Sequence, residues 1–343
     1  MRFIDLRSDT VTLPTDEMRQ AMFEAEVGDD VLEGDPTVIK LEEMAAEAVG
    51  KEASMFVVSG TMGNESAIYT HTKCGDEVIL ADNAHIVTHE VGSAAVISGV
   101  QLRTLRTDKG YLDAKDVEAT IRKENNIHYP ETGLICLENA RSDGSVVPID
   151  KMADVYAIAK KYDVPVHLDG ARLFNAALYL NVDVREITKY TDSVMFCLSK
   201  GLCAPIGSMV AGSKEFIERA KKSRKLMGGG MRQSGVIAAA GIVALTKMRG
   251  RLHVDHENAR LLADELSKIP NIKVDLNRVQ INMVFADMSG VGKDDSYIVG
   301  KMFEKGIKIL PSEDGFMRFV TNKDVTKKDV LYFIDCMKEI CLS

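Results

Sequence analysis

The chain has 343 residues, of which 45% are hydrophobic and 27% are charged, and its formal net charge is −8. This composition is typical of a globular protein long enough for one large domain and a smaller one. The acidic balance argues against nucleic acid as a partner, because phosphate backbones are bound by basic surfaces. No stretch of about 18 uninterrupted apolar residues occurs, so we expect no membrane span.

The first ten residues, MRFIDLRSDT, carry charges throughout and contain no apolar signal segment. We therefore expect a cytoplasmic protein. The cysteines are Cys74, Cys136, Cys197, Cys203, Cys336 and Cys341. They include no C-x-x-C pair, so we interpret them as small buried side chains in a reducing compartment rather than as a disulfide framework or a zinc site.

From about residue 40, helix-type and strand-type patterns alternate along the chain. Apolar positions at helical spacing predict helices over 37–49, 61–72, 113–123, 150–161 and 214–226. Short apolar runs predict strands over 53–58, 77–81, 94–97, 134–137, 164–168 and 194–198. Strands that alternate with helices indicate an α/β fold with a mostly parallel central sheet flanked by helices.

The pattern changes near residue 228. The stretch GGGMRQSG at 228–235 is expected to be a flexible loop, and the small-residue run that follows it a buried helix. Beyond these we expect a long amphipathic helix over 248–269, short strands at 272–274, 281–285, 307–310 and 317–319, and a last helix over 327–341. The sequence therefore predicts a large domain over 1–247, with an N-terminal arm, and a small α+β domain over 248–343.

Four polar residues directly follow strand-like runs: Ser59, Glu138, Asp169 and Lys200. In parallel sheets, ligand-binding and catalytic residues are usually found at the carboxyl ends of the strands. Lys200 is the one charge in FCLSKGLCAPIGSMV, residues 196–210. It is either a solvated loop cap, because lysine is rarely buried alone, or a desolvated amine able to form an imine with a carbonyl.

The segment SGTMGN at 59–64 lies between a strand and a helix. Backbone N–H groups at a helix start, with hydroxyls beside them, suit a phosphate, although Ser and Thr are also common simple N-caps. Neither a P-loop nor a dinucleotide fingerprint is present. Asp169 either caps a helix or faces a cationic ring nitrogen, and Lys200 follows it after about one strand–helix–strand excursion.

A phosphate cradle, a carboxylate for a ring nitrogen and an isolated lysine together meet the needs of pyridoxal 5′-phosphate. This cofactor requires an imine partner for its aldehyde, an anion site for its phosphate and an acid that keeps its pyridinium protonated. The protonated ring is the electron sink that stabilises a carbanion at the substrate α carbon. The order and spacing of these residues therefore predict a pyridoxal-phosphate enzyme.

The chain closely resembles the low-specificity L-threonine aldolases, which have the aspartate-aminotransferase fold (fold type I) of pyridoxal-phosphate enzymes. The match runs nearly end to end and is looser from about residue 250. The segments that carry it are LRSDTVT (6–12), EVGDDV (26–31), SGTMGNE (59–65), GDEVIL (75–80), NIHYP (126–130), HLDGARLFNAA (167–177), DSVMFCLSKGLCAPIGS (192–208) and GGGMRQSG (228–235).

The resemblance implies roles for single residues. It implies that Lys200 is the imine lysine and that Asp169 is the partner of the pyridine nitrogen. Arg172 resembles the family arginine that lies near the phenolic oxygen of the cofactor ring. It is also implied to bind the substrate. His85 is expected to stack on the ring. The phosphate cradle is expected at three consecutive residues, Ser59, Gly60 and Thr61.

Further residues are implied to bind substrate or to come from another subunit. Ser8 and Arg318 resemble the residues that hold the substrate carboxylate, against the alternatives of a locally bonded arm and a surface arginine. His128 matches a histidine near the substrate hydroxyl. Arg232 resembles a residue that reaches a cofactor phosphate, in a neighbouring subunit or its own. The resemblance also suggests a homotetramer, a dimer of dimers with shared sites.

The implied reaction is the reversible cleavage of L-threonine or L-allo-threonine to glycine and acetaldehyde. His85 or His128, directly or through a water, is the candidate base, and the choice between them stays open. One departure is visible, because Ala140-Arg141 stands where the family often has Thr-His, which bears on side-chain preference.

Other interpretations stay open. Within the cofactor class they are a β-eliminating lyase, a phenylserine aldolase, a transaminase or a racemase, and outside it a nucleotide-binding protein. The spacing of His85 and His89 superficially suggests a metal pair, but H-E-x-x-H and a third ligand are missing. We therefore expect no metal.

Overall fold

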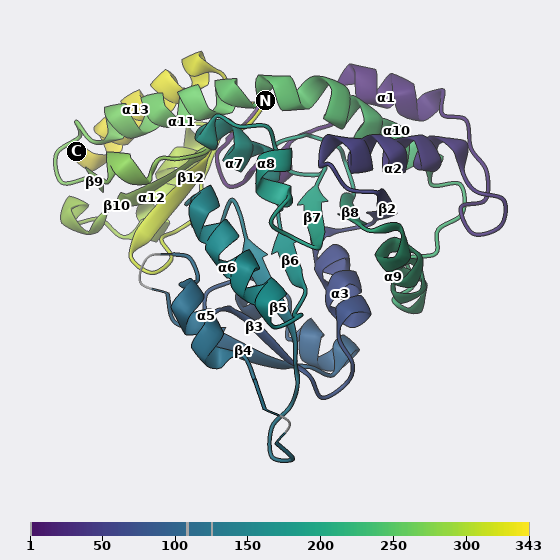
Figure 1. The fold of residues 1–343 in the computed structure, drawn as a ribbon. Coiled ribbons are helices and arrows are strands. Elements are labelled where there is room, and N and C mark those ends of the chain that lie inside the picture. Colours follow the sequence, from purple (N-terminus) through teal and green to yellow (C-terminus); the bar gives the residue numbers. More distant parts are fainter. Residues whose placement is uncertain (1, 108–109, 125, 343) are drawn as a thin grey trace.

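The computed structural model describes residues 2–107, 110–124 and 126–342. Its centre is a seven-stranded sheet (Figure 1) in the order β2-β8-β7-β6-β5-β3-β4. The strands are β2 (Ala53–Val57), β3 (Glu77–Ala81), β4 (Gln101–Leu105), β5 (Thr132–Glu138), β6 (Val166–Asp169), β7 (Ser193–Cys197) and β8 (Ser208–Gly212). Only β8 runs against its neighbours, so the expected mostly parallel sheet is confirmed.

The two faces of this sheet are covered by different helices, as successive side chains point to opposite faces. Met55 and Val57 of β2 pack with α3 (Gly60–His71) and α9 (Lys214–Leu226). Phe56, between them, packs in the cluster that contains α2 (Pro36–Ala48), α7 (Leu173–Leu180) and α10 (Gly235–Val243). Burial on both faces explains the continuous apolar runs of β7 and β8.

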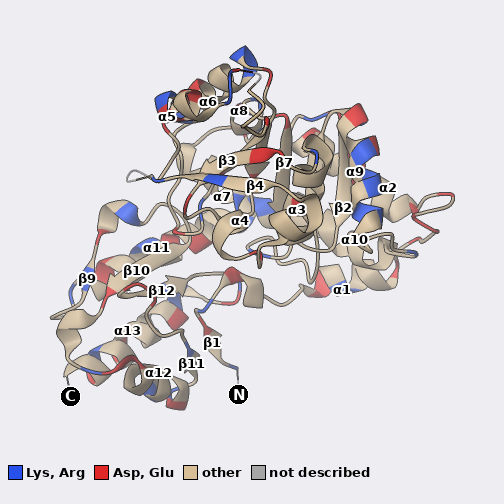
Figure 2. Cartoon of the chain, turned by 90° about the horizontal axis from the view of Figure 1, so that it is seen from below, with Lys and Arg blue, Asp and Glu red and all other residues tan. Residues whose placement is uncertain are grey.

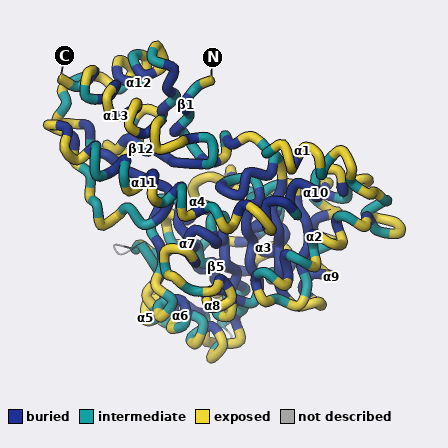
Figure 3. Tube along the Cα trace, turned by 90° about the horizontal axis from the view of Figure 1, so that it is seen from above, coloured by how far each residue is buried: buried dark blue, intermediate teal, exposed yellow. Residues whose placement is uncertain are grey.

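The remaining helices of this half lie around the same sheet (Figure 1). They are α1 (Asp16–Phe23), α4 (His85–Thr88), α5 (Ala114–Thr120), α6 (Ile149–Lys161) and α8 (Arg185–Thr188). Figure 3 shows the buried trace concentrated in the sheet and the inner sides of its helices. Figure 2 shows Lys, Arg, Asp and Glu interspersed on the outer helices in that view.

The C-terminal part builds a second, smaller core. An antiparallel sheet in the order β12-β10-β9 joins β9 (Lys273–Val274), β10 (Met283–Asp287) and β12 (Phe316–Val320). It packs with α11 (Leu252–Leu266), α12 (Asp295–Glu304) and α13 (Lys327–Leu342) in one apolar cluster. Strand β1 (Ile4–Asp5) pairs in parallel with β11 (Ile307–Lys308) beside this sheet, so the N-terminal arm reaches the C-terminal half. The domain boundary at residue 247 stays a prediction.

One expectation about a single element was wrong, and one strand was missed. Residues 94–97 are not a strand but part of a π-helix over Ala94–Ser98, in which Ala94 is buried and Val96 is 83% exposed. This turn ends at Gly99, whose φ of 65° is a left-handed conformation suited to glycine. The strand follows it as β4, a half-exposed edge strand whose polar sequence hid it.

Two further points concern composition. All six cysteines are free, and Cys74 is exposed rather than buried as expected. Within the described residues, no helix is both long enough and apolar enough to cross a membrane.

Candidate active site

Asp169 lies at the carboxyl end of β6, at the centre of the sheet. The register places it beside Glu138 of β5 and Met195 of β7. The side chain is 2% exposed, and its two oxygens accept hydrogen bonds from Asn64 Nδ2 (2.8 Å) and the backbone N–H of Ala171 (3.0 Å). The N-cap of the following helix α7 is Arg172, so Asp169 is not a helix cap. Each oxygen of this carboxylate accepts one of these hydrogen bonds, so the carboxylate can still accept a further hydrogen bond.

Lys200 lies in the turn that follows β7. The turn is closed by the Cys203 N–H, which donates to the Lys200 carbonyl (2.9 Å). Lys200 is half-buried, and its positive charge acts on the carboxyl of Asp9 and on the imidazole of His85. Its charge therefore lies within electrostatic range of Asp9 and His85 at the sheet edge, which favours the interpretation as a site lysine, and that role stays a prediction.

The start of α3 lies against the end of β7. Ser59 is the N-cap, and its Oγ accepts from the Met62 N–H (3.2 Å). A Cβ added at Gly60 would meet Cys197 Sγ at 3.1 Å, so this first turn approaches β7 closely. Gly60 and Thr61 are half-buried in the first turn of a 12-residue helix. Such a helix start offers free N–H groups and positive potential to an anion, beside the turn of Lys200.

Arg172 is held by a residue of the N-terminal arm. Its Nε and Nη2 donate to the two oxygens of Asp9 at 2.8 Å and 2.6 Å. Asp9 is fully buried, and Asn282 donates to it from the C-terminal half (3.3 Å). Burial alone would raise the pKa of Asp9, but Arg172, together with Lys200 and Asn282, holds it below its usual value. The sequence interpretation missed Asp9, although it lies inside RSDT.

Ser8 and Arg318 lie near this ion pair. Ser8 Oγ accepts from the backbone N–H (3.1 Å) and the hydroxyl (2.8 Å) of Thr10, as the alternative of a locally bonded arm expects. Arg318 extends from β12, and its half-buried guanidinium lies in the field of Arg172 and Asp9. Burial and the neighbouring Arg172 lower the pKa of Arg318. Because Asp9 already pairs with Arg172, the positive charge left for a carboxylate in this region is that of Arg318.

His85 opens the short helix α4 at the same edge. Its Nδ1 lies 2.9 Å from Glu90 Oε1, and its backbone N–H donates to Glu138 Oε2 (3.0 Å). The hydrogen bond to Glu90 raises the pKa of His85, against burial and with help from the charge of Asp169. The ring is 29% exposed and stacks on His89, with 5.3 Å between centroids.

The donor atoms of His85, Glu90 and Asp169 lie within 4.8 Å of one another. Three side chains with potential metal-ligand atoms therefore meet here, and His89 is not one of them. Hydrogen bonds already hold the three side chains, because Asn64 Nδ2 donates to both Glu90 (2.8 Å) and Asp169 (2.8 Å). Protein donors therefore bind one oxygen of Glu90, whereas its other oxygen, Oε2, is buried without a hydrogen-bond partner among the described residues. The sequence interpretation gave no role to Glu90 or Asn64.

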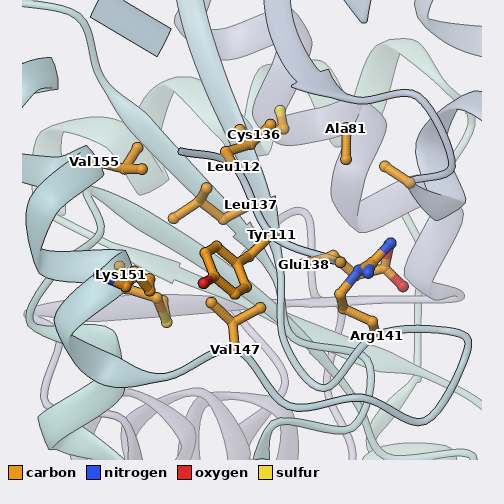
Figure 4. A pocket seen from close by; sticks show the side chains of 13 residues that line it. Ala81, Tyr111, Leu112, Cys136, Leu137, Glu138, Arg141, Val147, Lys151 and Val155 are labelled. Carbon is orange, nitrogen blue, oxygen red and sulfur yellow. The ribbon is translucent and has the colours of Figure 1, made fainter. Parts of the chain in front are cut away.

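Glu138 and Arg141 border the cluster on the other side. Burial and the charge of Asp169 raise the pKa of Glu138 to about 7, against hydrogen bonds from the His85 and Ser142 N–H groups. Arg141 is 3% exposed and donates to Asn83 Oδ1 at 2.5 Å. Figure 4 shows both beside a cavity of about 30 Å³ that Tyr111 also lines. This volume suits one water molecule and not a pyridine ring.

Two expected site residues, Arg232 and His128, are exposed and form no hydrogen bond or ion pair with this cluster among the described residues. Arg232 is exposed in the loop 228–235 and pairs with Asp29 at 3.0 Å. His128 is exposed in the loop that precedes β5, and its N–H donates to Asn126 (3.0 Å). That loop lies at the opposite end of β5 from Glu138, and seven strand residues (Thr132–Glu138) span about 20 Å. A single chain therefore does not bring His128 to the others, whereas the loop of Arg232 lies against the first turn of α3, where a Cβ added at Gly229 would meet Met62 Sδ at 2.8 Å.

Comparisons with known proteins place this arrangement in a family. The model of the beta-eliminating lyase family matches residues 5–289. The chain belongs to the beta-eliminating lyase family. The low-specificity L-threonine aldolase 1 of Arabidopsis thaliana is 45% identical to this lyase, over 100% of this chain and 98% of that protein.

Solved structures confirm the fold of this lyase. The threonine aldolase of Leishmania major superimposes with a TM-score of 0.82 at 18% identity, over 98% of this chain and 99% of that one. A structure of SPT with a PLP internal aldimine superimposes with a TM-score of 0.77 at 16% identity, over 98% and 87%. The fold is therefore that of the fold type I pyridoxal-phosphate enzymes, as the resemblance implied.

Proposed function

We propose that this lyase is a pyridoxal-phosphate-dependent L-threonine aldolase that cleaves L-threonine and L-allo-threonine reversibly to glycine and acetaldehyde. The observation that carries the proposal is the meeting of Lys200, Asp169 and the start of α3 at one edge of the sheet. The relatives of high identity are named threonine aldolases, which supports the choice of substrate.

The residues at this edge fit the cofactor. The first turn of α3, with Ser59, Gly60 and Thr61, offers N–H groups to a phosphate. Asp169 offers a buried carboxylate to a ring nitrogen, and Lys200 offers an amine to an aldehyde. When bound, pyridoxal 5′-phosphate supplies an electron sink for the bond broken at the substrate α carbon.

The protein's own groups bind the substrate and handle protons. Asp169 would hold a proton at the ring nitrogen, because hydrogen bonds from Asn64 and Ala171 orient its buried carboxylate. Arg318 and Arg172, with Ser8, bind the amino-acid carboxylate. His85 accepts the proton of the substrate hydroxyl, because its hydrogen bond to Glu90 raises the pKa of the imidazole and its ring is partly exposed at this edge.

A second subunit completes the site in this proposal. Arg232 and His128 are exposed on one chain, so they are available to a neighbouring copy. Arg232 would then reach a cofactor phosphate, and His128 the substrate hydroxyl, as an alternative base to His85. This arrangement corresponds to a cytoplasmic homotetramer built from dimers that share sites.

The second candidate is β-elimination on another amino acid, which the name of the family favours. The same lysine and aspartate serve both reactions, and the pocket around the substrate side chain decides between them. The test is incubation of the purified enzyme with each threonine diastereomer, phenylserine and serine, followed by product identification. Glycine and an aldehyde are the expected products, whereas pyruvate with ammonia, or a keto acid, would overturn the proposal.

A further inference from the structure

Two buried side chains link Asp169 and His85, the two groups to which the proposed function gives proton-handling roles. Asn64 Nδ2 donates to Asp169 Oδ2 and to Glu90 Oε1, both at 2.8 Å. The same Glu90 oxygen accepts from His85 Nδ1 at 2.9 Å. Asn64 and Glu90 are 0% and 1% exposed, so no solvent competes with these bonds.

The donor and acceptor in each hydrogen bond of this network follow from the buried residues that contact Asn64 on its other side. Asn64 uses both of its N–H groups on carboxylates, so its Oδ1 must accept, and the donor is His167 Nε2 at 3.2 Å. His167 is fully buried, and burial lowers its pKa to about 3, so the ring is neutral and its Nδ1 carries no proton. Ser193 therefore donates to His167 Nδ1 (2.9 Å) and accepts from His71 Nε2 (2.8 Å).

The helix that carries Asn64 has no room to shift. A Cβ added at Gly63 would meet Met195 Cγ at 2.6 Å and Val210 Cγ2 at 3.2 Å, so α3 lies tightly on β7 and β8. Close contact at the neighbouring residue fixes the amide of Asn64 relative to Asp169, which ends the strand beside β7. The network is therefore preorganised by the packing of α3 on the sheet.

We infer that Glu90 and Asn64 are positioning residues that join His85 and Asp169 into one hydrogen-bonded unit, hold the His85 imidazole with its proton on Nδ1, and leave Nε2 as its reactive nitrogen. A carboxylate that accepts from one ring nitrogen fixes the tautomer and orientation of a histidine and makes the other nitrogen more basic. The inference rests on the proposed function for the role of His85 and deepens it.

Several charged groups face His85, so the experiment has to distinguish their effects on the imidazole from the effect of Glu90. Asp169 and Lys200 act on the ring with opposite signs, and Glu138 accepts from the backbone N–H. His89 stacks on the ring. Glu65 on α3 faces Glu90, is 1% exposed, and is hydrogen-bonded by Ser93 at 2.6 Å. Glu65 is therefore the matched control, because it is an equally buried carboxylate that does not contact His85.

The experiment compares Glu90→Gln, Glu90→Ala and the control Glu65→Gln. Glutamine has the shape of glutamate and keeps an acceptor oxygen for His85, but it removes the charge. The apoenzyme is labelled with diethyl pyrocarbonate across a pH series, and peptide mass spectrometry follows the modification of His85. Glu90→Gln should lower the midpoint of His85 labelling by about one pH unit, because a neighbouring carboxylate favours imidazolium. Glu65→Gln should leave the midpoint in place.

A second readout concerns Asn64. Asn64→Ala should weaken the binding of pyridoxal 5′-phosphate to the apoenzyme by about tenfold or more, measured by absorbance titration, because Asp169 loses a donor. An unchanged midpoint in Glu90→Gln, an equal shift in Glu65→Gln, or unchanged cofactor binding in Asn64→Ala would each overturn the inference. Neither readout uses threonine, so a failure to cleave threonine would refute the proposed function without deciding this one.

Discussion

The carboxylate of Asp9 accepts two hydrogen bonds, of 2.8 Å and 2.6 Å, from the guanidinium of Arg172, which lies 163 positions further along the sequence. Both side chains are largely removed from water, with exposures of 0% and 9%. The N-terminal arm is thereby fastened to the start of α7, next to the residues that are proposed to bind substrate. A buried pair of this kind is costly to break, because the remaining charge has no partner.

Replacing Asp9 with Ala should therefore destabilise the protein strongly. We expect a loss of about 3 kcal/mol or more in the free energy of unfolding, because Arg172 stays buried with an unpaired charge. Denaturant unfolding measures it, with Glu131→Gln as the control. Glu131 pairs with Lys73 at the surface, where both side chains are more than half exposed, so that change should be near neutral. Equal effects of the two variants would contradict the prediction.

The buried imidazole of His167 predicts a specific dependence of stability on pH. Its pKa falls to about 3 in the folded state because of burial, below the value of about 6.5 expected when unfolded. The unfolded chain therefore binds the extra proton first, and stability from this group is complete above about pH 6.5 and lost as the pH falls. Compared with His167→Gln, the wild type should lose up to about 1.4 kcal/mol more per pH unit between pH 6 and pH 4. Urea unfolding at several pH values checks this difference, and parallel curves would refute it.

Gly63 should not tolerate a methyl group. Its added Cβ would lie 2.6 Å from Met195 Cγ, in the tight contact of α3 with the sheet. Gly63→Ala should cost about 1–3 kcal/mol of stability through overpacking. Gly250 is a matched control because a Cβ there meets nothing within 4 Å, so Gly250→Ala should be neutral or mildly stabilising. Thermal unfolding of both variants tests the contrast, and a neutral Gly63→Ala would show that α3 can shift.

Arg318 should affect substrate binding more than folding. Its half-buried guanidinium lies beside Arg172 and has no ion pair with any described residue, so a bound carboxylate is its natural partner. Arg318→Leu should raise KM for threonine by at least about tenfold, because a charge-assisted pair is lost. The comparison is Arg260→Leu, an exposed arginine on α11 that pairs with Asp264. Unchanged KM in Arg318→Leu would remove Arg318 from the site.

The order of elements could be predicted from sequence where burial was uniform. Strand β3 has the expected bounds, Glu77–Ala81. Lys200 follows β7 as expected, and Asp169 is the last residue of β6 rather than the residue after the strand. Strand β4 was missed because it is a half-exposed edge strand, and the apolar residues 94–97 before it form a π-helix instead. The spacing of apolar residues reflects which positions are buried, and few positions are buried in an edge strand such as β4.

The supporting residues of the site could not be predicted in the same way. Asn64 meets Asp169 across 105 positions, and Asp9 meets Arg172 across 163. Such pairs are set by how α3 and the arm pack on the sheet, which no local pattern records. The one available signal was that Asp9 and Asn64 lie inside RSDT and SGTMGN, and that Glu90 directly follows His89. These side chains hold the reacting groups in place, so they become visible only in three dimensions.

The central claim is that Lys200 carries the cofactor. The most direct measurement is borohydride reduction of the purified yellow enzyme, followed by peptide mass spectrometry and a threonine assay of Lys200→Ala. The account predicts a phosphopyridoxyl group on Lys200 and, in the variant, loss of the visible absorbance band and of glycine production. A colourless wild-type enzyme, a label on another lysine, or full activity in Lys200→Ala would contradict it.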